Sequence, residues 1–347
     1  MLELTGDTLS ETDDSTPVHP GWLSVFTQLM KLRVIILLQI TAICAILVHD
    51  MLARNEMIDA NRTWSDTLYA SVITIIGGTL SAGGSNAINM WYDADIDQHM
   101  RRTRNRPVPM GYISSQGALM FGLIIATLGC AVFLLVSWKA AFWSLFSVAF
   151  YVLIYTVWLK RTTPQNIVIG GIAGSTPPLI GWAVASADYS LNNLNPFDLV
   201  SPIPWMMFAL IFLWTPPHFW CLALYRSGEY AQVNVPMMNE VKGAEYTLKQ
   251  SKGYCVMLFL LGSVPCFWPE SGLPLLWAFI SGALTLWYAV SVWSVNPREA
   301  FDENGRMPGA AKSFYRSLYY LGWMFLMIVL ISAIPPDSLG PLGPLPI

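Results

Sequence analysis

The chain has 347 residues, of which 54% are hydrophobic and only 12% charged, about half the charged share of an ordinary soluble domain. This composition excludes a soluble globule and favours a chain embedded in a lipid bilayer. A formal net charge of −3 leaves no basic surplus for phosphate backbones and argues against nucleic-acid binding. The five cysteines form no CxxC pair, which argues against a zinc site or a disulfide framework.

The chain begins with a polar segment. Its first twenty residues hold five acidic side chains and no lysine or arginine, so they lack the basic start of a cleavable signal peptide. We expect residues 1–30 to form a disordered cytoplasmic tail.

Apolar stretches near the length that spans a bilayer follow. They cover residues 34–52, 67–88, 115–137, 140–159, 166–186, 203–224, 254–270, 273–293 and 315–334. The sequence therefore predicts an all-α membrane bundle of nine transmembrane helices, forming a single domain over residues 31–334.

The basic residues predict how this bundle is oriented. Sixteen of the nineteen lysines and arginines fall in the N-terminal segment and in alternate loops, and three fall on the other side. Because cytoplasmic loops carry the basic excess, the N-terminus is expected in the cytoplasm and the C-terminus outside, in a cell (inner) membrane. Residues 335–347 are rich in proline and are expected to form a loose outer tail.

Small residues cluster in two of the expected spans, where close helix packing is the favoured interpretation and an opening of the backbone for a flat ligand is the alternative. They are Gly77, Gly78, Ser81, Gly83 and Gly84 in the second span, and Gly170, Gly171, Gly174 and Ser175 in the fifth.

Acidic residues mark the cytoplasmic end of the second span. Asn89, Asp93 and Asp97 recur every four residues, so they cover about 80° of one helix face. Carboxylates at the end of a membrane helix are costly unless they are paired, hydrated or bound to a cation. Since Mg²⁺ takes one or two carboxylates plus substrate phosphates, these three residues are candidate metal ligands and catalytic groups. Asp95 points away from them and is expected to be solvated or paired with an arginine.

Basic and amide side chains that match phosphate oxygens come next along the chain, in the loop after the acidic residues and between the fourth and fifth spans. Together with the carboxylates they predict a site for Mg²⁺ and a diphosphate, although positive-inside anchoring also accounts for the basic residues. The candidate diphosphate-binding residues are Arg101, Arg102, Arg104, Arg106, Lys160, Arg161 and Asn166.

A third polar patch lies in the sixth span. Pro216 and Pro217 are expected to interrupt this helix, and His218 follows them among large aromatic residues. The histidine either makes an interhelical hydrogen bond or contacts a porphyrin. The candidate heme-binding residues are His218, Trp220, Arg226 and Glu229.

Three segments of the chain carry a resemblance to a known family. NMWYDADIDQHMRRTRNRP, YTVWLKRTTPQNIVIGG and FLWTPPHFW, in this order, resemble the heme O synthases, a branch of the intramembrane prenyltransferases that is also called the protoheme IX farnesyltransferases. Two departures stand beside this likeness. Lys31-Leu32-Arg33 replaces the usual Lys-Pro-Arg, and Glu229-Tyr230 stands where an aspartate is common.

The resemblance implies an enzyme that transfers the farnesyl group of farnesyl diphosphate to a vinyl group of protoheme IX and adds water. It implies Mg²⁺ at Asn89, Asp93 and Asp97, a site facing the cytoplasm, and heme as substrate rather than cofactor. The implied pathway makes heme A synthase and the terminal oxidase candidate partners.

Two alternatives stay open at this point. One is a membrane prenyltransferase that acts on a quinone precursor or another aromatic acceptor and uses the same aspartates. The other is a non-catalytic heme-binding or oxidase-assembly protein, which would not need the acidic residues.

Overall fold

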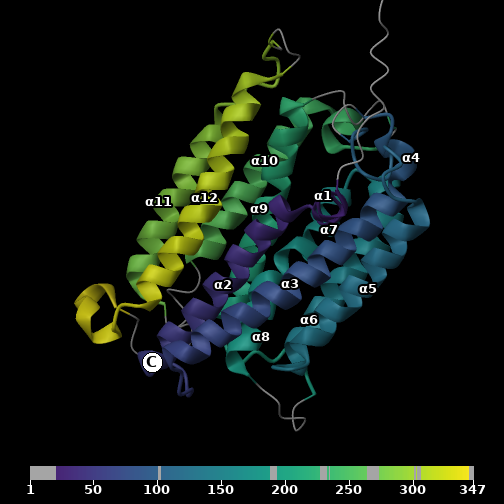
Figure 1. The fold of residues 1–347 in the computed structure, drawn as a ribbon. Coiled ribbons are helices and arrows are strands. Elements are labelled where there is room, and N and C mark those ends of the chain that lie inside the picture. Colours follow the sequence, from purple (N-terminus) through teal and green to yellow (C-terminus); the bar gives the residue numbers. More distant parts are fainter. Residues whose placement is uncertain are drawn as a thin grey trace, which may run out of the picture.

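A computed structural model describes residues 21–100, 103–187, 194–226, 233, 235–263, 273–300, 302 and 306–343. In this part the chain forms long helices that lie side by side, without a β-strand (Figure 1). The all-α expectation is confirmed. The longer helices are α2 (Leu32–Arg54), α3 (Trp64–Tyr92), α5 (Ser115–Phe133), α6 (Trp138–Ala149), α7 (Asn166–Ser175), α8 (Pro177–Ser186), α9 (Ile203–Tyr225), α10 (Met238–Ser263), α11 (Leu275–Trp293) and α12 (Pro308–Ser332).

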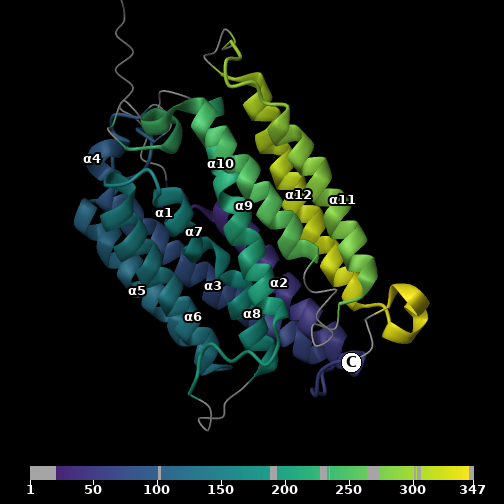
Figure 2. The same ribbon diagram turned by 180° about the vertical axis from the view of Figure 1, so that it is seen from behind.

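Short elements complete the bundle. They are α1 (Trp22–Met30), α4 (Ala94–Asp97), the π-helix η1 (Phe150–Trp158), and the 3₁₀ segments η2 (Leu159–Arg161) and η6 (Pro336–Leu342). The views from the front and from behind agree that α4 and the start of α10 lie toward one end, while η6, drawn in yellow, lies at the other (Figures 1 and 2).

Eight helical segments in the described part are long and apolar enough to cross a membrane. The expected span over 254–270 falls on α10 and on residues outside the described part. α10 runs from Met238 with a kink at Gly243 (φ +81°), and charged residues between 240 and 252 hide its early start from the hydropathy pattern. The count of nine spans and the orientation of the termini therefore stay predictions.

Both expected tails are corrected in part. The tail was expected to reach residue 30, but α1 is helical from Trp22, because Val25 and Leu29 are fully buried against α3 and α5. At the other end, residues 336–342 form the 3₁₀ segment η6, and Leu275 N donates to the carbonyl of Gly343. Residues 1–20 and 344–347 lie outside the described part.

The prolines act differently from our expectation in one span. α9 continues from Ile203 to Tyr225 with Pro216 and Pro217 inside it, so the expected interruption is wrong. Each proline removes only one backbone hydrogen bond, and packing against α7, α10 and α12 supports the helix at this point. In the fifth span the chain does break, at Thr176 between α7 and α8.

Glycines set the close contact between α3 and α5. A Cβ atom on Gly84 would lie 2.5 Å from the backbone nitrogen of Ala126 and from the carbonyl oxygen of Gly122. A Cβ atom on Gly129 would lie 2.2 Å from the nitrogen of Ser81. The packing interpretation of the small residues in the second span is confirmed. α3 packs closely against α5 in the turns that precede the acidic residues.

This contact generates a stability test. Gly84→Ala pushes a methyl group into backbone atoms of α5 and should lower the free energy of unfolding by about 1–3 kcal/mol. Thermal unfolding in detergent measures the loss. Gly322→Ala in α12 is the matched control, because nothing lies within 4 Å of the added methyl. Equal stability of the Gly84 variant and the wild type would contradict the packing.

Candidate active site

The acidic residues lie where α3 ends. The expected single helix over 89–97 is corrected, because α3 stops at Tyr92, Asp93 caps it, and a separate short helix holds Asp97. The side chains still meet: Asn89 Nδ2 donates to Asp93 Oδ2 over 2.9 Å. Asp93 is 0% exposed and Asp97 2% exposed, so both carboxylates are withdrawn from water.

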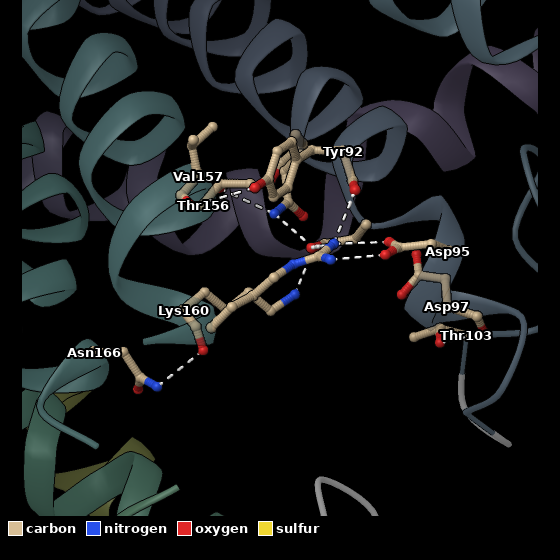
Figure 3. A network of polar contacts seen from close by, with 12 residues as sticks. Tyr92, Asp95, Asp97, Thr103, Thr156, Val157, Lys160 and Asn166 are labelled. Atoms are coloured by element: carbon tan, nitrogen blue, oxygen red, sulfur yellow. Dashed lines mark hydrogen bonds and ion pairs between the residues drawn. The ribbon is translucent and has the colours of Figure 1, made fainter. Parts of the chain in front are cut away.

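Three cations from separate segments surround this acidic end. Lys160 Nζ donates to Asp93 Oδ2, and Arg106 Nη1 donates to Asp97 Oδ2 over 2.6 Å. Lys31 Nζ donates to Asn89 Oδ1 over 2.8 Å. Figure 3 shows the network around Lys160 and the segment of Asp95 and Asp97. The buried negative charge is thereby balanced, as a buried carboxylate requires.

The remaining acidic residue of this segment, Asp95, turns outward, as predicted. The Asp95 side chain is 60% exposed, and both of its oxygens accept hydrogen bonds from Arg161 over 2.7 Å. These bonds lower the pKa of Asp95. Arg161 also lies 3.7 Å from Asp93 Oδ1. The shorter contacts of Arg161 are thus with Asp95, and they join the end of the fourth span to α4.

The remaining predicted diphosphate residues differ in their placement. Asn166 is buried, and its Nδ2 donates to the carbonyl oxygens of Pro236 and Lys160 over 3.1 and 3.4 Å. The Asn166 amide nitrogen therefore joins the backbone at Lys160 to the backbone at Pro236. Arg104 is exposed, and Arg101 and Arg102 lie outside the described residues.

Lys31 is the residue that sequence reasoning missed. It has φ +55° between α1 and α2, and Asn86 Nδ2 donates to the carbonyl of the preceding Met30. Its burial, together with the positive charges of Arg106 and Lys160, lowers the pKa of Lys31 to about 7. The sequence offered two signals: the lysine stands where the related family has Lys-Pro-Arg, and it lies directly before the first apolar stretch, a position that membrane anchoring explains equally well.

The donor set at this end fits Mg²⁺. Asp93 and Asp97 supply carboxylate oxygens, and Asp93 Oδ1 is buried without a hydrogen-bond partner in the described part of the chain. Among the residues that the structure describes, no group of three His, Cys, Asp or Glu side chains converges there. Such a set suits a cation that keeps water and phosphate oxygens among its ligands, rather than a closed metal cage.

Two of the predicted heme residues, His218 and Trp220, lie in α9. His218 Nδ1 and Ser317 Oγ of α12 share a 2.6 Å hydrogen bond, and the imidazole stacks on Trp214 at 4.1 Å. Trp220 is buried and packs edge-on against Tyr254 of α10. Arg226 follows the last turn of α9, and Glu229 lies outside the described residues. The geometry of His218 favours the interhelical hydrogen bond.

An apolar cluster joins the end of α9 to the acidic end. Ile167 of α7 and Ala223 of α9 pack with Val235 and Met237, and Ile96 of α4 lies against them. Val235 and Met237 therefore lie in one cluster with Ile96, the neighbour of Asp95 and Asp97 in the chain.

The comparisons with known proteins identify this arrangement. The model of the UbiA prenyltransferase family matches residues 51–318. The chain belongs to the UbiA prenyltransferase family. Among its relatives, the protoheme IX farnesyltransferase of Bartonella tribocorum is 37% identical over 335 residues, covering 96% of this chain and 98% of the relative. That of Caulobacter sp. is 41% identical over 298 residues, covering 85% and 79%.

Solved structures of UbiA proteins share the fold. Digeranylgeranylglyceryl phosphate synthase has a TM-score of 0.66 at 16% identity, covering 90% of this chain and 98% of the other. A UbiA homologue from Archaeoglobus fulgidus bound to GPP and Mg²⁺ has a TM-score of 0.54 at 14% identity, covering 88% and 99%. At this distance the likeness concerns the fold alone.

The contact of His218 generates a test of its role. If the histidine chiefly joins α9 to α12, His218→Ala and Ser317→Ala should each lower stability, and the double variant should lose about 1 kcal/mol less than the sum. Thermal unfolding in detergent measures this coupling. Additive losses, accompanied by weaker heme binding in the His218 variant only, would assign the imidazole to heme.

Proposed function

We propose that this protein transfers the farnesyl group of farnesyl diphosphate to a vinyl group of protoheme IX, with addition of water, and so makes heme O. The buried pair Asp93 and Asp97, ringed by cations, carries the reaction class, because it suits a metal–diphosphate leaving group. Relatives at 36–41% identity that bear the name protoheme IX farnesyltransferase support the acceptor and the prenyl donor.

The cations have a direct task in this reaction. When the allylic C–O bond of farnesyl diphosphate breaks, negative charge grows on the departing diphosphate. Lys160, Arg106 and Lys31 already converge on the acidic end, so they are close enough to stabilise that charge. We assign Asn89, Asp93 and Asp97 to the metal, whose bound form neutralises the diphosphate.

The second half of the reaction needs an apolar enclosure. The farnesyl carbon freed from oxygen bonds to the terminal vinyl carbon of heme, water adds its oxygen to the inner vinyl carbon, and one proton leaves. Helices that exclude bulk water protect the allylic cation from direct hydrolysis. We place heme beside α9, where the guanidinium of Arg226 matches the charge of its anionic propionates; Trp220 and Glu229 complete the residues that we predict for heme.

We further propose how the protein sits in its membrane. The basic excess supports a cytoplasmic N-terminus, an active site facing the cytoplasm of a cell (inner) membrane, and nine spans. Residues 31–334 then act as one domain. Heme A synthase or the terminal oxidase would receive the product, because free heme intermediates are hydrophobic and reactive.

The metal assignment is tested at two neighbouring aspartates. Asp93→Asn removes the buried charge and should lower heme O formation at least about a hundredfold. Asp95→Asn is the matched control and should stay within about threefold, because Asp95 is exposed and faces Arg161. Membranes supplied with heme, farnesyl diphosphate and Mg²⁺ are assayed for heme O by mass spectrometry.

Three outcomes of this assay contradict parts of the proposal. Near-normal heme O from the Asp93 variant would overturn the metal assignment. Prenylation of a quinone precursor instead of heme by the wild type would show that the same site acts on another acceptor. Heme binding without any turnover by the wild type would favour a non-catalytic assembly role.

Lys31 gives an independent test of the donor side. Lys31→Met keeps the length of the side chain and removes its charge, so KM for farnesyl diphosphate should rise about tenfold. Arg33→Met, two residues along and exposed, should leave KM unchanged. Steady-state kinetics at saturating heme separates the two variants, and an equal KM for both would remove Lys31 from the site.

A further inference from the structure

Thr156 contacts the acidic end through Asn89 but is not among the metal, diphosphate or heme residues proposed above. It is 0% exposed, in the π-helix η1. Asn89 Nδ2 donates to Thr156 Oγ1 over 3.1 Å and to Asp93 Oδ2 over 2.9 Å. The NH₂ group of Asn89 thus donates to both Thr156 and Asp93, and its Oδ1 accepts from Lys31.

The two segments meet in a matched register. Thr156 pairs with Asn89 and Lys160 pairs with Asp93, each across 67 positions of the chain. Tyr92, which lies between Asn89 and Asp93 in the chain, donates its OH to the carbonyl of Val157. Thr156 lies in the π-helix η1 and Lys160 in the 3₁₀ segment η2 that follows it, so the four-residue spacing is kept across a change of helix type. Figure 3 shows Thr156 and Lys160 on the same segment.

The orientation of the Asn89 amide matters for the metal and the diphosphate. A rotated amide would turn its NH₂ group toward the ammonium of Lys31, where donor faces donor, and would withdraw its only metal-binding atom, Oδ1. Asp93 holds the amide only while its carboxylate faces Asn89. Once that carboxylate is drawn to a metal, the hydroxyl of Thr156 is the remaining acceptor in this contact set.

We propose that Thr156 is a positioning residue that fixes the amide of Asn89 with Oδ1 toward the metal–diphosphate end of the site. This role rests on the proposed function, because it presupposes Mg²⁺ and a prenyl diphosphate at that end. Thr156 from η1 and Lys160 from η2 then act on two successive turns of the acidic segment.

The test uses the full chain in detergent and the nonreactive analogue farnesyl thiodiphosphate. Mg²⁺ is titrated at a fixed analogue concentration, and the Mg²⁺ needed for half-maximal thermal protection is measured. Thr156→Val keeps the shape of the side chain and removes the acceptor, so this Mg²⁺ concentration should rise about three- to tenfold. Thr156→Ser restores the hydroxyl and should return to within twofold of the wild type.

Thr74→Val is the matched control. Thr74 is buried in α3, the helix that carries Asn89, and its hydroxyl has no hydrogen-bond partner in the described part of the chain. The Mg²⁺ requirement of this variant should equal that of the wild type. Heme O formation is measured in parallel, and it should fall for Thr156→Val and recover for Thr156→Ser.

Each result decides for or against the role of Thr156. An unchanged Mg²⁺ requirement in Thr156→Val, a serine variant as impaired as the valine variant, or an equal effect of Thr74→Val overturns it. A wild type without Mg²⁺-dependent protection overturns both this role and the proposed metal site. A raised Mg²⁺ requirement, with quinone prenylation in place of heme O, supports Thr156 and rejects only the heme acceptor.

Discussion

The burial of two carboxylates at a membrane boundary is the constraint on which the rest of this structure depends. Removing Asp93 and Asp97 from water costs several kcal/mol for each charge unless cations and hydrogen bonds compensate. The compensating cations come from three segments, at Lys31, Lys160 and Arg106. The ends of α1, α3 and η2 must therefore converge, and the helix packing below them keeps them together.

The local part of this site could be predicted from the sequence, because it depends on spacing along one segment. Asn89, Asp93 and the outward Asp95 follow helical periodicity across the end of α3. Lys31 and Thr156 escaped prediction because their partners lie 58 and 67 positions away, and only tertiary packing brings them together. Of the fold, the helical class and most spans followed from apolar length.

The misjudged elements share a physical cause. The π-helix over 150–158 is almost wholly apolar, so a change from 3.6 to a wider turn leaves no mark in its hydropathy. α10 starts in charged sequence and α1 is short, so neither matches an apolar span of about 20 residues. α9 stays helical through two prolines because α7, α10 and α12 pack against it, and this tertiary packing cannot be read from the local sequence.

The placement of Lys31 also has a consequence in time. This lysine leaves the ribosome 58 residues before its partner Asn89 and well over one hundred residues before Thr156 and Lys160. At about 5–20 residues per second, it waits roughly 3–12 seconds for Asn89. The acidic end therefore emerges after Lys31 and shortly before Arg106, but well before Lys160, the partner of Asp93, has been made. Insertion must hold an incompletely neutralised charge at the membrane surface until the fourth span arrives.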